Sequence, residues 1–225
     1  MGVVAGSVAT AFLTLLTTLI FVNVAQGLYP LLIAKTSTAD IDLQQATPES
    51  LESLGRSGLI RLWHNLPAGT LLNDDGAYYR GTLMKTGPLH QTSSFITHNL
   101  FPPRNCNLWL GKFIESSGEG QNVFKPLTAL TATSESRRGN MVHARDFCVR
   151  QANSRIDRRP CFLLDYSDGR SKNSFPWCGM RDELRMVRPG MYLGLGSMSV
   201  TGGPFNSALF VLEKQHGVPG SISGR

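Results

Sequence analysis

The hydrophobic pattern begins with a long uncharged stretch at the N-terminus. Residues 3–22 are rich in Val, Ala, Leu, Thr and Phe, and the first charged residue is Lys35. A helix of this length crosses the roughly 30 Å hydrocarbon core of a bilayer. The pattern predicts a transmembrane anchor within residues 1–34. The alternative is a signal peptide, since Ala25-Gln26-Gly27 resembles a cleavage site, but no basic residue precedes the run and it is longer than a usual h-region.

A polar linker (residues 35–47) and short helices are expected next. Thr47 is a candidate N-cap, and Pro48 occupies the first helical position. A second helical pattern follows, with apolar residues at the spacing of one helix face. These residues are Leu59, Leu62, Trp63 and Leu66. Such a stripe is typical of a helix that packs against a core.

From Pro67 onward the helical period disappears, and short β-rich runs alternate with turn residues. The expected strands cover residues 77–85, 92–98, 108–115, a less regular region from 123, 141–151, 161–166, 181–188, 191–198 and 208–213. About eight or nine strands at hairpin spacing indicate a mainly β protein with an antiparallel sandwich or barrel. Glycines inside the runs, such as Gly81 and Gly194, favour the strong coiling of a closed barrel. We therefore expect a barrel domain over residues 48–215 and a flexible tail over 216–225.

The entry to the first strand has a family resemblance. Gly76-Ala77-Tyr78, after a short helical entry and before the antiparallel strands, resembles the G-x-W of lipocalin/calycin barrels, with Tyr in place of Trp. In that family a basic residue near the last strands packs across the motif, which implies Arg185 or Arg188 here. The resemblance covers roughly residues 60–215 and implies a lipocalin-like fold, which by itself does not fix a function.

Charge and cysteine content exclude two classes of function. The net charge is +6, but the arginines are scattered and no Lys/Arg block is interleaved with aromatics, so we expect no nucleic-acid partner. The cysteines form no C-x-x-C pair and no histidine lies at ligand spacing from them, which argues against structural zinc. Free thiols are favoured over two disulfides. The cysteines are Cys106, Cys148, Cys161 and Cys178.

The densest cluster of functional groups lies in residues 181–185. In a strand, Arg181, Glu183 and Arg185 share one face, while Asp182 and Leu184 share the other. Guanidinium groups match carboxylate or phosphate headgroups bidentately, which makes this row a candidate ligand site. The alternative is an ion-pair ladder on a solvent-facing surface.

Two further residues are candidates for contact with a ligand. Asp165 ends an apolar strand, and Tyr192 follows the Pro189-Gly190 turn. Either side chain, directed into a barrel, can polarise a ligand carbonyl or act as an acid or base. A site formed by His90, His98 and His143 is disfavoured because no carboxylate lies at motif spacing. We assign no metal, no cofactor and no catalytic residue.

These observations favour a single-pass, membrane-anchored, lipocalin-like protein. We expect it to bind a hydrophobic or amphipathic small molecule (lipid, pigment or isoprenoid) beside the membrane lipid, through Arg181, Glu183, Arg185, Tyr192 and Asp165. One alternative is a structural accessory subunit of a membrane complex, whose barrel is plugged by its own side chains. Another is an enzyme acting on a lipophilic substrate, with Asp165, Tyr192 or a histidine as acid or base.

Overall fold

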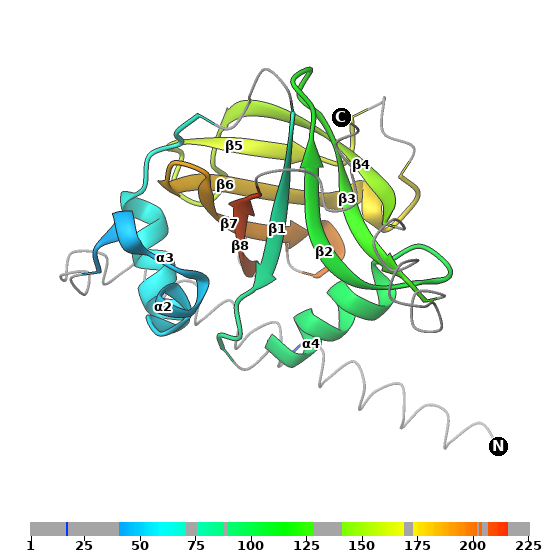
Figure 1. The fold of residues 1–225 in the computed structure, drawn as a ribbon, viewed down its shortest axis with the longest axis horizontal. Helices are drawn as coiled ribbons and strands as arrows, with labels where there is room; N and C mark the ends of the chain where they lie inside the picture. Colours follow the sequence, from blue (N-terminus) through cyan, green and yellow to red (C-terminus); the bar gives the residue numbers. More distant parts are fainter. Residues whose placement is uncertain are drawn as a thin grey trace, which may run out of the picture.

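The chain forms a closed antiparallel barrel of eight strands in sequence order, with β1 paired to β8 (Figure 1). This computed structural model describes residues 41–70, 76–87, 90–127, 141–168, 173–201 and 207–215, together with Thr17 and Gly203. The strands are β1 (Ala77–Leu83), β2 (Cys106–Ile114), β3 (Glu119–Pro126), β4 (Val142–Asn153), β5 (Pro160–Asp165), β6 (Met180–Arg188), β7 (Met191–Met198) and β8 (Ala208–Lys214). The predicted mainly β antiparallel barrel is confirmed.

Two short helices precede the barrel. In α2 (Pro48–Glu52), the Thr47 and Ser50 hydroxyls each accept a hydrogen bond from the other's backbone amide, which makes a capping box. The longer α3 (Gly55–Asn65) buries Leu59, Leu62 and Trp63, as the helical stripe predicts. Part of the expected linker is ordered as a 3₁₀ turn, η1 (Leu43–Gln45).

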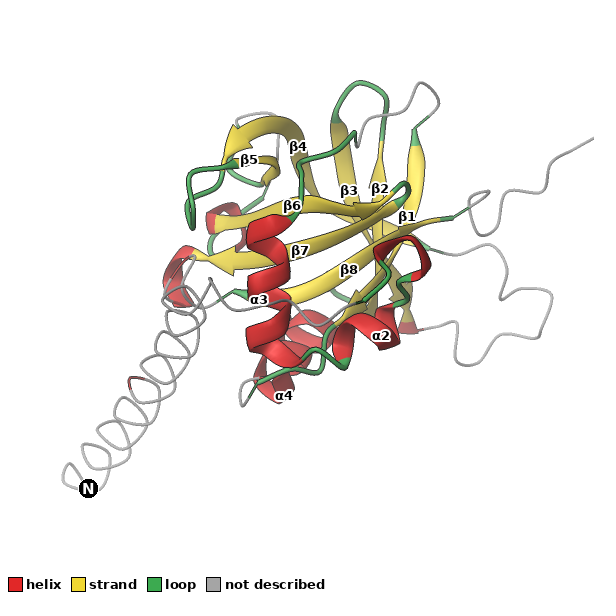
Figure 2. Ribbon diagram, turned by 90° about the vertical axis from the view of Figure 1, so that its left-hand side faces the viewer, coloured by secondary structure: helices red, strands yellow, loops and turns green. Residues whose placement is uncertain are grey.

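Helix α3 covers the outer surface of β6, β7 and β8 (Figure 2). Its apolar residues form one buried cluster with outward-facing side chains of the strands, including Leu193, Leu195, Leu209 and Val211. The inward-facing side chains of the same strands belong to a second cluster inside the barrel. This half of the sheet is therefore buried on both faces, which explains its nearly continuous apolar runs.

Aromatic rings fill the barrel interior, and glycines on the inner wall make room for them. A Cβ on Gly81 would meet the Trp109 ring at 2.3 Å, and one on Gly194 would meet the Phe210 ring at 2.3 Å. The interior aromatic residues are Tyr79, Trp109, Phe124, Phe147, Phe162, Tyr166, Tyr192 and Phe210. These glycines, which the sequence associates with coiling, thus also set where the large rings lie.

The expected strand over residues 92–98 is wrong. This segment is helical, as α4 (His90–Phe95) followed by the π-helical turn η2 (Ile96–Leu100). A closed barrel offers no free edge for another strand, whereas a helix satisfies its own backbone. The segment connects β1 to β2, and Phe101 at its end packs against the core rings of Phe124 and Tyr166.

The expected anchor (residues 1–34), the first part of the linker and the tail (216–225) lie outside the described residues, apart from Thr17. Within the part of the chain that is described, no helix combines the length and apolarity needed to cross a bilayer.

The glycine positions predict a specific stability difference. Gly194→Ala is expected to destabilise the barrel by about 1–3 kcal/mol, because the new methyl group overlaps the enclosed Phe210 ring. At Gly179 the nearest atom to an added Cβ is 3.4 Å away, so Gly179→Ala is a matched control with a small effect. Urea unfolding of both variants checks this, and equal midpoints would contradict the proposed packing.

Candidate functional site

A polar network lies inside the aromatic barrel. The Lys112 ammonium contacts Asp182 Oδ2 at 2.8 Å, and donates to Asn122 Oδ1 at 2.8 Å and to the Tyr166 hydroxyl at 2.7 Å. The Tyr166 hydroxyl donates to Asp182 Oδ2 and accepts from Asn122 Nδ2, each at 2.9 Å. All four side chains are buried, with at most 2% of each residue exposed. The network joins β2, β3, β6 and the residue that follows β5.

The ammonium form of Lys112 suits this position because its three N–H groups meet three oxygen acceptors. Burial lowers the pKa of Lys112, and the Asp182 carboxylate opposes that effect. Burial likewise raises the pKa of Tyr166, with Asp182 adding to the effect. Four aromatic rings, among them those of Trp109 and Phe147, lie 5.1–5.6 Å from Lys112 Nζ.

A pocket of about 430 Å³ opens where β1 and β2 separate. Their pairing extends only from Ala77↔Ile114 to Arg80↔Gly111. Beyond that point β1 stays with β8, and β2 stays with β3. We call this the lateral pocket, and its lining includes Arg80, Gly81, Leu83, Met84, Lys85, His90, Ser94, His98, Leu108 and Trp109.

Trp109 links the lateral pocket to the interior network. Trp109 lines the pocket and belongs to the barrel core, and its indole N–H donates to Asn122 Oδ1 at 2.9 Å. Its backbone N–H donates to His98 Nδ1 at 3.1 Å. Because Nδ1 accepts this bond, Nε2 carries the proton of a neutral His98. Burial lowers the pKa of His98, which favours that neutral form.

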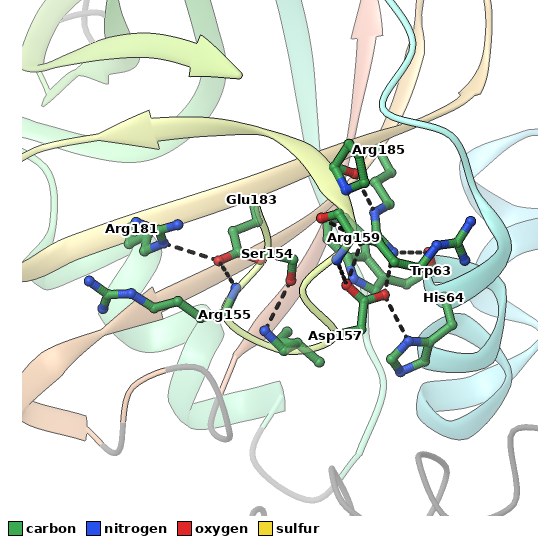
Figure 3. A network of polar contacts seen from close by, with 11 residues as sticks. Trp63, His64, Ser154, Arg155, Asp157, Arg159, Arg181, Glu183 and Arg185 are labelled. Carbon is green, nitrogen blue, oxygen red and sulfur yellow. Dashed lines mark hydrogen bonds and ion pairs between the residues drawn. The ribbon is translucent and has the colours of Figure 1, made fainter. Parts of the chain in front are cut away.

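The predicted row Arg181, Glu183 and Arg185 does share one face of β6, as the alternation indicates (Figure 3). This face is the outer one, beside α3 and the turn between β4 and β5. Arg185 is fully buried and donates to both carboxylate oxygens of Asp157, at 2.7 and 2.6 Å. It also donates to the Trp63 carbonyl at 2.8 Å, and its guanidinium lies 4.7 Å from the Trp63 ring.

The other members of the predicted site have partners different from those of Arg185. Glu183 accepts from Arg181 Nε and from the backbone amide of Arg155, both at 3.0 Å. Asp165 pairs with the exposed Arg150 at 2.7 Å and accepts hydrogen bonds from Ser167. Tyr192 faces the barrel interior, and its hydroxyl donates to the Thr70 carbonyl. Four of the five predicted residues therefore lie on the outer face of β5 and β6, with Asp165 opposite Arg181, whereas Tyr192 lies in the core.

The histidines considered as metal ligands lie in two parts of the structure. His90 and His98 line the lateral pocket, whereas His143 packs against the Phe113 ring. Among the described residues, no three His, Cys, Asp or Glu side chains are grouped as metal ligands. The four cysteines are free thiols. The Tyr78 hydroxyl donates to the Leu110 carbonyl. Of the two arginines implied by the lipocalin resemblance, Arg185 lies over the Trp63 ring, and Arg188 donates to the Ala46 carbonyl and to Glu213.

The interior network predicts a large stability effect. Lys112→Met removes the ammonium and leaves the Asp182 carboxylate buried without a counter-ion, which is expected to cost about 3–5 kcal/mol. Lys112→Met combined with Asp182→Asn is expected to recover part of that loss, because the uncompensated charge is gone. Urea unfolding of the two variants measures the difference. An unchanged midpoint for Lys112→Met would contradict the network.

The outer network predicts a pH dependence. Burial alone raises the pKa of Asp157, but hydrogen bonds from His64 and Arg185 outweigh it and hold that pKa well below its usual range. A lowered pKa stabilises the fold above the pKa of the unfolded state, about 3.9, and the effect is lost as pH falls toward the folded-state value. Asp157→Asn is therefore expected to cost about 3 kcal/mol at pH 7, with a smaller deficit at pH 3.

Urea unfolding at pH 7 and pH 3 tests this effect. Arg150→Gln is the control, because its ion pair with Asp165 is exposed and is expected to contribute less than about 1 kcal/mol. A deficit for Asp157→Asn that stays the same at both pH values would show that the carboxylate charge has no role.

Comparison with known proteins adds a structural likeness only. No family model matches the chain, and no curated protein matches it. A solved structure described as "Crystal structure of protein from Thermomonospora curvata" is similar to this chain at 14% sequence identity and a TM-score of 0.47, over 78% of this chain and 100% of that one.

Proposed function

We propose that this protein is a membrane-tethered, lipocalin-like barrel that binds a small hydrophobic or amphipathic molecule, such as a lipid, pigment or isoprenoid, in the lateral pocket. The observation that carries the proposal is the pocket itself. Its volume of about 430 Å³ lies in the range of ligand sites, which is roughly 300–1,000 Å³. Its lining combines buried apolar groups, such as Trp109 and Met84, with polar side chains. The closed eight-stranded barrel in sequence order is consistent with lipocalin architecture.

The proposed ligand enters from the side of the barrel rather than along its axis. Aromatic rings and the Lys112 network occupy the interior. The arginines first expected to meet a headgroup are engaged elsewhere, since Arg185 is buried against Asp157 and Arg181 bonds to Glu183. The separation of β1 from β2 supports an entry for the ligand at Leu83 and Leu108.

Exposed apolar side chains near the pocket support a position beside a membrane. Phe95 of α4 is 56% exposed, Leu100 of η2 is 53% exposed, and Leu108 at the pocket is 41% exposed. The uncharged residues 3–22 supply the proposed tether, as a single-pass anchor. Together they would hold the lateral pocket close to a source of lipophilic ligand.

The second candidate is an accessory subunit of a membrane complex. Two observations favour it. The barrel interior is filled by the protein's own side chains, and some apolar side chains are exposed, including Phe175 at 77% and Phe95 at 56%. Under this proposal, the exposed side chains contact another subunit. The enzyme alternative receives no such support, since Asp165 and Tyr192 lie apart.

Binding of the neutral lipophilic dye Nile red to the full chain separates these proposals. Ser94 of α4 lines the pocket, whereas Ser93 of the same helix is not among the lining residues. Ser94→Trp is expected to weaken dye binding by about tenfold or more, because the indole fills the pocket, while Ser93→Trp leaves it near wild type. Dye bound elsewhere, for example by the apolar N-terminal stretch, contributes equally to both variants.

The opposite result favours the accessory subunit. If Ser94→Trp and Ser93→Trp bind the dye as well as the wild type does, the lateral pocket is not a ligand site. The accessory proposal then predicts that Phe95→Ser and Phe175→Ser release the protein from a membrane complex, measured by native electrophoresis of solubilised membranes.

A further inference from the structure

We infer that the lateral pocket selects an amphiphile with an anionic headgroup, and that Arg80 and Lys85 hold that headgroup. The inference rests on the proposed function and adds the charge class of the ligand. Arg80 lies on β1, and Lys85 follows the end of the same strand. Both line the lateral pocket, and none of the described residues that line it is an Asp or a Glu.

The two cations of the pocket are exposed, whereas two of its apolar residues, Trp109 and Met84, are buried. Arg80 and Lys85 are exposed, while Trp109 and Met84 are 5% and 3% exposed. An amphiphile matches this gradient when its tail lies against Trp109 and its head lies at the rim. A charged head at the rim keeps part of its hydration, which limits the desolvation penalty.

Neither cation has a fixed anionic partner among the described residues. No ion pair or hydrogen bond joins the Arg80 or Lys85 side chain to another described residue. Glu213, opposite Arg80 on β8, pairs with Arg188 at 3.3 Å. Glu52 accepts from the backbone amide of Lys85 at 3.0 Å rather than from its ammonium.

Among the described carboxylates, Glu49 also interacts with the charge of Arg80. The pKa of Glu49 is lowered chiefly by backbone and Thr47 hydrogen bonds at the start of α2, and Arg80 makes the smallest contribution. Glu49 therefore has hydrogen-bond partners of its own, and its interaction with Arg80 is weaker than these bonds. The positive charge at the pocket rim stays available to a ligand.

The remaining polar groups of the pocket can hydrogen-bond to either an anionic or a neutral headgroup. The neutral tautomer of His98 has an Nε2–H donor, and Ser94 and Thr82 supply hydroxyl groups. These groups bind a neutral alcohol head as well as a carboxylate. Discrimination between the two heads is therefore assigned to the cationic side chains of Arg80 and Lys85.

The test compares two ligands that share a ten-carbon tail. Decanoate and 1-decanol, each below its solubility limit, displace Nile red from the full chain at pH 8 and low salt. We expect decanoate to bind about fivefold more tightly than decanol. Arg80→Gln combined with Lys85→Gln is expected to abolish this preference and leave decanol binding unchanged. High salt is expected to reduce the preference in the wild type.

The matched control is Lys125→Gln combined with Arg150→Gln, which removes the same charge from residues that do not line the pocket. Retention of the preference in this control supports the inference, and its loss there overturns it in favour of a general surface-charge effect. Equal binding of decanoate and decanol to the wild type also overturns the inference. In that case the proposed pocket still stands if Ser94→Trp weakens binding of the dye. If Ser94→Trp has no effect on the dye, both the pocket and the inference fail.

Discussion

The buried ion pair between Lys112 and Asp182 is the constraint on which the barrel interior depends. Two opposite charges inside an aromatic core are tolerated only when each keeps its partner and further hydrogen bonds. Because side chains alternate along a strand, a one-residue slip of β2 or β6 would send one of the two charges to the other face of the sheet. The pair therefore favours a single register. Through Asn122 it also fixes the indole of Trp109, and hence one wall of the lateral pocket.

The barrel has two halves with different surroundings. Strands β6 to β8 are covered outside by α3 and filled inside by aromatic rings, and this half also holds the buried Arg185–Asp157 pair. Strand β1 is paired with β8 through Leu83 but with β2 only as far as Arg80. The lateral pocket lies at the seam between β1 and β2, where β1 continues beside β8 and β2 continues beside β3. A pocket at a seam requires no space along the barrel axis, which is why a filled barrel and a ligand site are compatible.

Local sequence patterns predicted most strands because turns and alternation are local features, as at Pro189-Gly190, where Gly190 adopts a positive φ of 78°. They failed for residues 92–98, because the closed barrel offers this β-prone segment no free strand edge with which to pair. The face shared by Arg181 and Arg185 was also predictable from alternation. The residues that Arg185 contacts on that face, Trp63 and Asp157, are distant in the sequence and were not. Trp109 and Lys112 are three residues apart, and strict alternation would place them on opposite faces. A register shift between Trp109 and Gly111 brings both inward, and alternation alone does not reveal it.

The cations of the protein differ in what they can offer a ligand. Lys112 and Arg185 are buried and already bonded to Asp182 and Asp157, so an external anion would have to displace a fixed carboxylate and leave it uncompensated. A cation at an exposed rim carries no such penalty, since it exchanges hydration for the ligand's charge. Buried charge in this fold therefore specifies structure, while the proposed recognition of a ligand uses the exposed charge at the seam between β1 and β2. In the densest charged run of the sequence, on β6, Arg181 and Arg185 likewise already pair with the carboxylates Glu183 and Asp157.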